Sequence, residues 1–287
     1  MTPNNNLSVL PWYSSIGQQN ARKWWVYDRV YPLFTQAGFM LPFQILRTHR
    51  AGLSISYFKV YSDDGTLIGD FTTEIVNMGL VIKPFASFGY DVIVFPGLFP
   101  VFTSMLNGRY YAELSDGTDK WYSEIFTVVN DISPYLKIEW WDVEDFTMDA
   151  GTIVYEDPQF KNVLYLQADL AKPEYTFEEE GENRDGYFFP IKQISEKRYR
   201  FSFLASEYLL DVMRLIRMAD YVRITNNGQV FYPDTFLITP EWENEGDVAA
   251  VEAVFDTDTV AKKIGRRYVI PGNGDFNNDY NNDFDNE

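Results

Sequence analysis

The residues with the clearest chemical potential are acidic side chains next to two tryptophans. Five carboxylates surround Trp140 and Trp141, namely Glu139, Asp142, Glu144, Asp145 and Asp149. A pair of carboxylates can cleave a glycosidic bond and aromatic rings can hold a sugar, so the pattern is compatible with glycoside hydrolysis. In a strand, however, Trp140 shares one face with Leu136 and Ile138, whereas Trp141 shares the other with Lys137. We therefore expect one tryptophan in a core and the other at the surface or an interface.

Other catalytic chemistry has little to build on. The chain contains no cysteine, which removes thiolate nucleophiles, disulfides and cysteine-ligated metals. Its one histidine, His49, stands between Thr48 and Arg50, where a surface or packing role is expected. A serine triad would have to use this histidine, but no G-x-S-x-G, Walker or G-x-G-x-x-G motif occurs. We predict that the protein is not an enzyme and binds no cofactor.

The C-terminal tail carries oxygen donors at alternate positions, which is a pattern that can bind calcium. An EF-hand loop beginning at Asp275 would need glycine at its sixth position and glutamate at its twelfth. Tyr280 and Asn286 occupy those positions instead. We therefore expect a solvated acidic tail without a metal site.

Composition limits the classes of partner. The formal net charge of −18 repels phosphate, so we expect no sequence-specific nucleic acid among the partners. The most apolar stretch, residues 92–105, is broken by Pro96, Gly97 and Pro100, which predicts no membrane span, and residues 1–7 do not read as a secretion signal. Aromatic residues form 17% of the chain, a bias that favours β-structure and protein interfaces.

Strands are the elements that must position any site in the first half of the chain. Alternating or apolar runs predict them at residues 53–60, 67–76, 79–82, 91–95, 109–114 and 121–128. Asp64-Gly65 and Asp116-Gly117 provide hairpin turns between them. The spacing is typical of an immunoglobulin- or fibronectin-like sandwich over residues 21–130, after an N-terminal arm at 1–20.

A second β-rich domain is expected over residues 135–265. Its predicted strands are 135–142, 163–168, 187–191, 198–204, 221–225, 229–232, 235–238 and 248–256, with an acidic loop at 178–182 and a hairpin turn at 226–228. One amphipathic helix is predicted at about 206–219, with Ser206 as its N-cap. Its apolar stripe is Leu209, Val212, Met213, Ile216 and Ala219. The fold class is therefore mainly β, with two β-sandwich or barrel-like domains.

The end of the chain looks suited to contact with another subunit. A basic cluster, Lys262, Lys263, Arg266 and Arg267, extends into the start of a C-terminal arm at 266–287, whose acidic tail from Asp275 repeats an aromatic residue every four positions. The arm's expected contact residues are Asp275, Phe276, Asp279, Tyr280, Asp283 and Phe284. Opposite charges placed so closely favour docking on a neighbouring copy, with the aromatics as anchors, although a solvated basic turn is equally compatible with the cluster.

The second half also resembles a known family over residues 135–265. The resemblance is carried by Leu136-Lys-Ile-Glu-Trp-Trp-Asp142, Phe160-Lys-Asn-Val-Leu-Tyr-Leu166, Lys172-Pro-Glu-Tyr175, Gly186-Tyr-Phe-Phe-Pro190, Lys192-Gln-Ile-Ser-Glu-Lys197, Phe203-Leu-Ala-Ser-Glu-Tyr-Leu-Leu210 and Asp256-Thr-Asp-Thr-Val260. These runs resemble virion structural proteins of tailed phages of Bacteroidetes, including crAss-like phages.

The resemblance implies a structural subunit of the virion. It would belong to the tail, collar or baseplate, as a ring-forming head-to-tail connector or tail-barrel component assembled in the host bacterial cytoplasm. Its partners would be copies of itself and other tail or portal proteins, without a membrane. The alternative from the residues alone is a carbohydrate-binding or carbohydrate-cleaving sandwich protein of a gut bacterium. Native mass distinguishes the two, because a ring is far heavier than a 33.4 kDa monomer.

Overall fold

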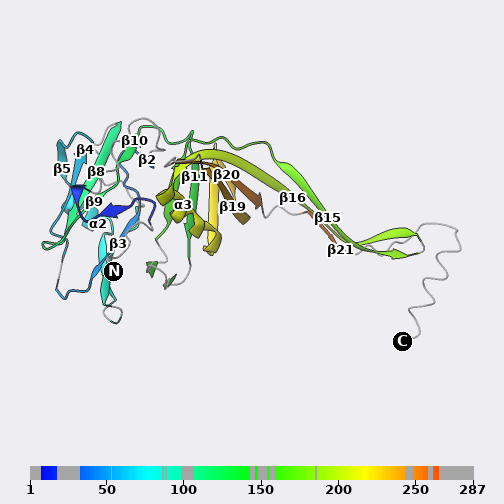
Figure 1. Cartoon of the computed structure of the whole chain (residues 1–287), viewed down its shortest axis with the longest axis horizontal. Coiled ribbons are helices and arrows are strands. Elements are labelled where there is room, and N and C mark those ends of the chain that lie inside the picture. Colours follow the sequence, from blue (N-terminus) through cyan, green and yellow to red (C-terminus); the bar gives the residue numbers. More distant parts are fainter. Residues whose placement is uncertain are drawn as a thin grey trace. The chain divides into compact units, whose positions relative to one another are not determined.

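The computed structural model describes twelve stretches of the chain, and all structural statements below concern them. They are residues 8–17, 33–52, 54–85, 87, 89–97, 107–142, 146–147, 154–155, 160–184, 186–242, 248–257 and 261–264. The fold is mainly β, with curled sheets of sandwich and barrel-like form (Figure 1), which confirms the expected fold class.

The chain divides into two compact units. The first unit contains residues 1–174 and 198–258, and the second contains residues 175–197 and 259–287. Both predicted β-domains, 21–130 and 135–265, contribute to the first unit. The boundary expected between them near residue 130 stays a prediction.

The first half of the chain forms two sheets. The larger sheet has seven strands among the described residues, and its main path is β1 (Trp12–Tyr13), β9 (Lys120–Ser123), β8 (Gly108–Ser115), β10 (Phe126–Val129) and β2 (Leu33–Gln36). β4 (Tyr57–Ser62) pairs with β8, and β5 (Leu67–Asp70) pairs with β4 across the expected Asp64-Gly65 turn. The smaller sheet has the order β3 (Phe43–Thr48), β7 (Tyr90–Phe95) and β6 (Val81–Phe85). All these pairs are antiparallel except β10 with β2.

Two predicted strands in this half are partly wrong. The run 121–128 is divided between β9 and β10, and residues 124 and 125 belong to neither strand. The run 67–76 is a strand only to Asp70, after which α2 (Thr72–Asn77) begins. The side chain of Asp70 accepts hydrogen bonds from the amide and the hydroxyl of Thr72, which turns the chain out of the strand. Ile75 is then the residue by which this short helix enters the core. A single apolar anchor leaves no helical period to read in the sequence.

The third sheet is built around β11 (Leu136–Trp141). β14 (Asn162–Leu166) and β17 (Tyr221–Asn226) flank it, and β18 (Gln229–Phe231) pairs with β17. The β17–β18 hairpin is confirmed at the predicted place, with Asn227 at φ 48° and Gly228 at φ 79°. Two consecutive positive φ values define the turn that matches strand twist best, and asparagine followed by glycine adopts them at little expense. A separate two-stranded pair joins β12 (Phe146–Thr147) to β13 (Val154–Tyr155).

The fourth sheet corrects two expectations. Its order is β15 (Glu174–Arg184), β16 (Tyr187–Ser206), β20 (Val248–Thr257) and β19 (Pro233–Trp242), and β21 (Ala261–Ile264) also pairs with β16. The predicted acidic loop at 178–182 lies within β15, because pairing with β16 overrides the weak strand preference of glutamate. The two strands expected at 187–191 and 198–204 are one continuous strand, since residues 192–195 also pair with β21.

The predicted helix exists but is shorter and changes type. α3 (Glu207–Met213) continues as a 3₁₀ turn, η2 (Arg214–Met218). Ser206 precedes α3 as expected, although its side chain makes no capping hydrogen bond. The apolar stripe packs as predicted, because Leu209, Val212, Met213 and Ile216 are all buried. Neither of the two α-helices seen in the described stretches is long and apolar enough to cross a membrane.

A single large core connects the sheets of the first unit. Aromatic rings fill much of it, such as Trp12 and Phe43, whose ring centroids lie 4.6 Å apart, and Tyr199 and Phe255, at 5.3 Å. A smaller apolar cluster contains Leu46, Val92, Val94, Phe160 and Leu215. The aromatic bias of the composition is therefore used mainly in packing, as expected for half-buried pleated surfaces.

The second unit is a ribbon of strands. β15 and the first part of β16 are joined by a two-residue turn, so they must run antiparallel. β21 pairs antiparallel with residues 192–195 of β16 (Figure 1). The side chains of β15 from Tyr175 to Asn183 are exposed or half-buried. We call this three-stranded element (residues 175–197 and 261–264) the ribbon.

Candidate functional site

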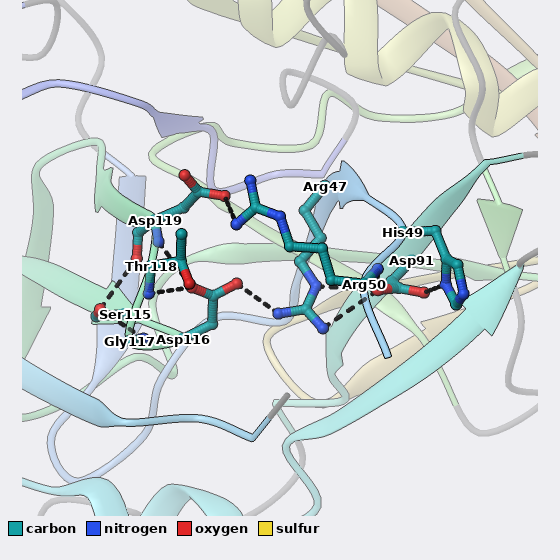
Figure 2. Close-up of polar contacts among 9 residues, drawn as sticks. All are labelled: Arg47, His49, Arg50, Asp91, Ser115, Asp116, Gly117, Thr118 and Asp119. Atoms are coloured by element: carbon teal, nitrogen blue, oxygen red, sulfur yellow. Dashed lines mark hydrogen bonds and ion pairs between the residues drawn. The ribbon is translucent and has the colours of Figure 1, made fainter. Parts of the chain in front are cut away.

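The most concentrated polar chemistry in the described residues is a buried ionic network centred on Arg47. Arg47 in β3 and Asp91 in β7 are direct partners across the antiparallel pair. Nε and Nη2 of Arg47 both lie 3.2 Å from Oδ2 of Asp91, and Nη1 contacts Oδ2 of Asp116 (Figure 2). The three side chains are 2%, 2% and 0% exposed. One guanidinium therefore holds two buried carboxylates, one in β7 of the smaller sheet and one in the turn after β8 of the larger sheet.

The turn after β8 is shaped to present Asp116. Its Oδ1 accepts hydrogen bonds from the amides of Thr118 and Asp119, at 2.9 and 2.7 Å. The Ser115 hydroxyl accepts from the Gly117 amide and donates to the Asp119 carbonyl. Gly117 has a φ of 88°, which a residue with a side chain rarely adopts. One carboxylate oxygen of Asp116 therefore fixes the turn, and the other is left for Arg47.

A second group of residues extends the network to the surface. Nδ1 of His49 lies 2.6 Å from Oδ1 of Asp91, and the histidine side chain is 33% exposed. The Arg50 amide donates to Oδ2 of Asp91. Nη1 of Arg50 lies 2.8 Å from Oδ2 of Asp119, which forms an ion pair between two partly exposed side chains. The angles of this contact are not those of a hydrogen bond. His49 is thus a partly exposed hydrogen-bond partner of the buried Asp91, at the edge of the network.

The surroundings keep both central aspartates ionised. Burial by itself would raise the pKa of Asp91, but hydrogen bonds from His49 and the Arg50 amide and the charge of Arg47 bring that pKa below its ordinary value. Burial likewise opposes the shift at Asp116, yet the amides of Asp119 and Thr118 and the Arg47 side chain lower its pKa. In the folded state the network therefore consists of one cation, Arg47, and two ionised carboxylates, Asp91 and Asp116.

Acid should weaken the fold through this network. Because the folded pKa of each aspartate lies below its unfolded value of about 3.9, the unfolded chain takes up protons first as pH falls. The stabilisation is present above that value and is lost as pH drops through the folded pKa. We expect urea denaturation between about pH 6 and pH 2 to show this decline, and Asp116→Asn, which keeps an acceptor for the turn, to decline less. If the difference in the free energy of unfolding between the wild type and Asp116→Asn does not become smaller in acid, Asp116 is not a source of this pH dependence.

The geometry also limits what this site can do chemically. A histidine that is hydrogen-bonded to a buried aspartate supplies two of the three members of a catalytic triad. In the described part of the chain, however, the His49 ring has Asp91 as its one hydrogen-bond partner, and no hydroxyl nucleophile is aligned with it. Asp91 is also neutralised by Arg47. The arrangement serves as a clamp between two sheets.

The carboxylates next to the tryptophans do not form an acid–base pair in the described residues. Glu139 is buried, with Oε1 2.9 Å from Nζ of Lys137 and Oε2 2.7 Å from Arg223. Asp142 accepts a hydrogen bond from the Asp220 amide, and burial raises its pKa. The remaining three, Glu144, Asp145 and Asp149, lie outside the described residues. Glu139 is thus used as an ion-pair partner.

The two tryptophans point to opposite faces of β11, as predicted. Trp140 is 1% exposed and lies in the core with Leu136 and Ile138. Trp141 is half-buried on the other face, where Tyr221 stacks on it at 5.5 Å and Nζ of Lys161 lies 4.3 Å from its ring centroid. These contacts cover ring surface that a sugar would need, so Trp141 is a poor stacking platform.

Only two of the predicted interface residues lie in the part of the chain that the structure describes. Lys262 and Lys263 lie in β21, opposite Ile194 and Gln193 of β16, so at least this half of the basic cluster is strand and not turn. Eight others lie outside the described residues: Arg266, Arg267, Asp275, Phe276, Asp279, Tyr280, Asp283 and Phe284. The N-terminal arm expected at 1–20 is corrected in part, because residues 12–13 form β1, which pairs with β9, and Val9, Leu10 and Trp12 are buried in the core. The proposed role of the C-terminal arm stays a prediction.

The Arg47 network was not predicted from the sequence, although a signal for it exists. Arg47 interrupts the apolar face of Phe43 and Ile45, and Asp91 directly precedes four apolar residues. A charge placed in a buried strand calls for an opposite charge nearby. Across the described ranges no group of three or more His, Cys, Asp or Glu side chains is arranged to hold a metal ion. A scan of protein-family models finds no match to this chain, and a search of curated proteins finds none either.

Proposed function

We propose that this protein is a structural subunit that assembles with copies of itself, as a ring-forming component of the tail, collar or baseplate of a tailed phage. The observation that carries the proposal is the ribbon, which exposes large apolar side chains on strands that have little core of their own. The proposed partners are further copies and other tail or portal proteins, and the proposed location is the virion.

The ribbon displays apolar residues where a free-standing element should be polar. Tyr175 is 70% exposed, Phe177 62%, Ile191 50% and Phe188 47%. Tyr175 and Phe177 share one face of β15, because they are two positions apart. Nζ of Lys197 lies 5.8 Å from the Tyr175 ring centroid and Gln193 bonds Glu179, so the odd-numbered residues of both strands, including Ile191, share that face.

Such an element is expected to bind another surface. A two-stranded hairpin is marginally stable by itself in water, and a third strand of four residues adds little. Clustered exposed apolar residues mark sites of protein contact, and aromatic anchors contribute much of the affinity in such contacts. The ribbon would therefore gain stability by covering this face with a neighbouring subunit.

The assignment to a virion is supported by the position of the ribbon in the sequence. The resemblance to virion structural proteins extends over residues 135–265, which includes β15, β16, β20 and β21. The enzymatic alternative has less support, because Glu139 is engaged by two cations and Trp141 by Tyr221 and Lys161. A subunit of an assembly needs surfaces for contact and no reactive group.

Native mass spectrometry of the full chain tests the proposal. We expect the wild type to form a discrete oligomer and Tyr175→Ser/Phe177→Ser to remain mostly monomeric, because the anchors of the contact are lost. The matched control is Leu237→Ser in β19, which is 48% exposed but lies in the first unit. Thermal melts of the monomers should be alike, since all three side chains are exposed. A wild type that stays monomeric at its highest soluble concentration, or a ribbon variant that assembles like the wild type, contradicts the proposal.

A further inference from the structure

The two outer strands of the ribbon differ in charge. β15 pairs with one edge of β16 and β21 with the other, so β15 and β21 form the two edges of the ribbon. In the described part of the chain, no strand pairs with the outer side of either. An exposed strand edge offers unpaired amide and carbonyl groups to another strand. The ribbon therefore has two edges at which a sheet can continue.

The charges of these edges are complementary. β15 contains five glutamates and one arginine, whereas β21 contains two lysines and no acidic residue. Contacts inside the ribbon neutralise the acidic edge only weakly, since Glu180 lies 4.0 Å from Nζ of Lys192 and is 74% exposed. Glu178 is exposed and has no ion pair or hydrogen bond with a described residue. Two acidic edges repel each other, and an acidic edge attracts a basic one.

We propose that neighbouring copies join edge to edge, with β15 of one copy pairing with β21 of the next. This inference rests on the proposed function, because it names the contact by which the subunits assemble. Both strands run antiparallel to β16, so they are parallel to each other, and the joining pair is parallel when all ribbons point the same way. Such a contact uses two different surfaces, and a head-to-tail contact of this kind closes into a ring when its rotation permits. The charges disfavour the alternative two-fold dimer, which would pair like edges.

Charge reversal on each edge tests the pairing. Glu178→Lys/Glu180→Lys places two cations in the middle of β15 and leaves that edge without net charge, so it no longer attracts the basic edge of β21. Lys262→Glu/Lys263→Glu makes both edges acidic. We expect each variant alone to need at least about tenfold more protein to assemble, as for loss of about 1.4 kcal/mol per contact. Mixing the two variants should restore assembly with alternating copies, which native mass spectrometry detects as equal numbers of each. A chain carrying all four substitutions should assemble by itself, which also shows that the ribbon tolerates them.

The absence of cysteine permits a second, independent test. In Glu178→Cys/Lys262→Cys, the two cysteines lie on opposite edges of β16, about 9–10 Å apart as two strand spacings. A disulfide requires Cα atoms within about 7 Å, so the bond cannot form within one ribbon. Oxidation should therefore link different copies into a ladder of covalent oligomers. Each single-cysteine variant, as the matched control, should stop at dimers.

The outcomes separate this inference from the proposed function. If the wild type assembles while the charge variants assemble equally well, or if the mixture and the four-substitution chain fail to recover, the edges are not the contact and the inference falls alone. A double-cysteine variant that oxidises no further than its single-cysteine controls has the same consequence. If the wild type never assembles, the proposed function falls as well.

Discussion

Replacing Arg47 by methionine should lower the free energy of unfolding by about 3–5 kcal/mol, because it leaves two buried aspartates without their counter-charge. Arg47 is 3% exposed and its fork contacts Asp91 and Asp116, which are both ionised and buried. Methionine keeps most of the aliphatic volume, so the loss reports charge and hydrogen bonding more than packing. Urea denaturation at neutral pH measures the change.

Two matched substitutions make this result specific. Arg50→Met removes a cation three positions after Arg47, whose partner Asp119 is 42% exposed, and should change the stability by less than about 1 kcal/mol. Arg47→Lys keeps the charge but loses the planar fork, so its effect should fall between the two. Equal effects of Arg47→Met and Arg50→Met would contradict the importance of the buried network.

A triple variant distinguishes two causes of the lower stability of Arg47→Met, namely uncompensated buried charge and the simple loss of a contact. In Arg47→Met/Asp91→Asn/Asp116→Asn the buried charges disappear together with the cation. We expect this triple variant to be more stable than Arg47→Met, since an uncompensated buried charge is more unfavourable than a neutral amide. A triple variant that is less stable than the single one would mean that the aspartates stabilise the fold without Arg47.

Local patterns predicted much of the fold. β11 and the β17–β18 hairpin follow from alternation and from Asn227-Gly228, because both signals lie within a few residues of the structure they specify. The stripe of α3 follows for the same reason, although the change to a 3₁₀ turn at Arg214 does not. The opposite orientations of Trp140 and Trp141 required only strand parity.

Partners that are distant in the sequence decided the rest. The glutamates of β15 are poor strand formers, and only β16, beyond the turn, makes them a strand. The Arg47 network joins residues 44 and 69 positions apart, which no local pattern connects. The charged edges of the ribbon became visible only once β21 was placed beside β16. The candidate site was therefore less predictable than the strands that position it.

Truncating Trp140 to alanine should cost about 3–5 kcal/mol of stability, because it empties a large volume in the middle of the third sheet. Trp140 is 1% exposed, and its strand β11 is paired on both sides, with β14 and β17. The matched control is Trp141→Ala on the opposite face, where the half-buried ring leaves less of a cavity and the loss should be smaller. Urea denaturation compares the two.

A third substitution at this position separates volume from polarity. No described residue accepts a hydrogen bond from the Trp140 indole nitrogen, which is buried. Leaving such a group unpaired is unfavourable by about 1–3 kcal/mol. Trp140→Phe removes that group while it keeps an aromatic ring in the core, so we expect it to lose far less stability than Trp140→Ala. If phenylalanine destabilises the protein as much as alanine, the indole nitrogen has a partner and contributes through it. If neither substitution lowers the stability by more than about 1 kcal/mol, Trp140 does not lie in a packed core.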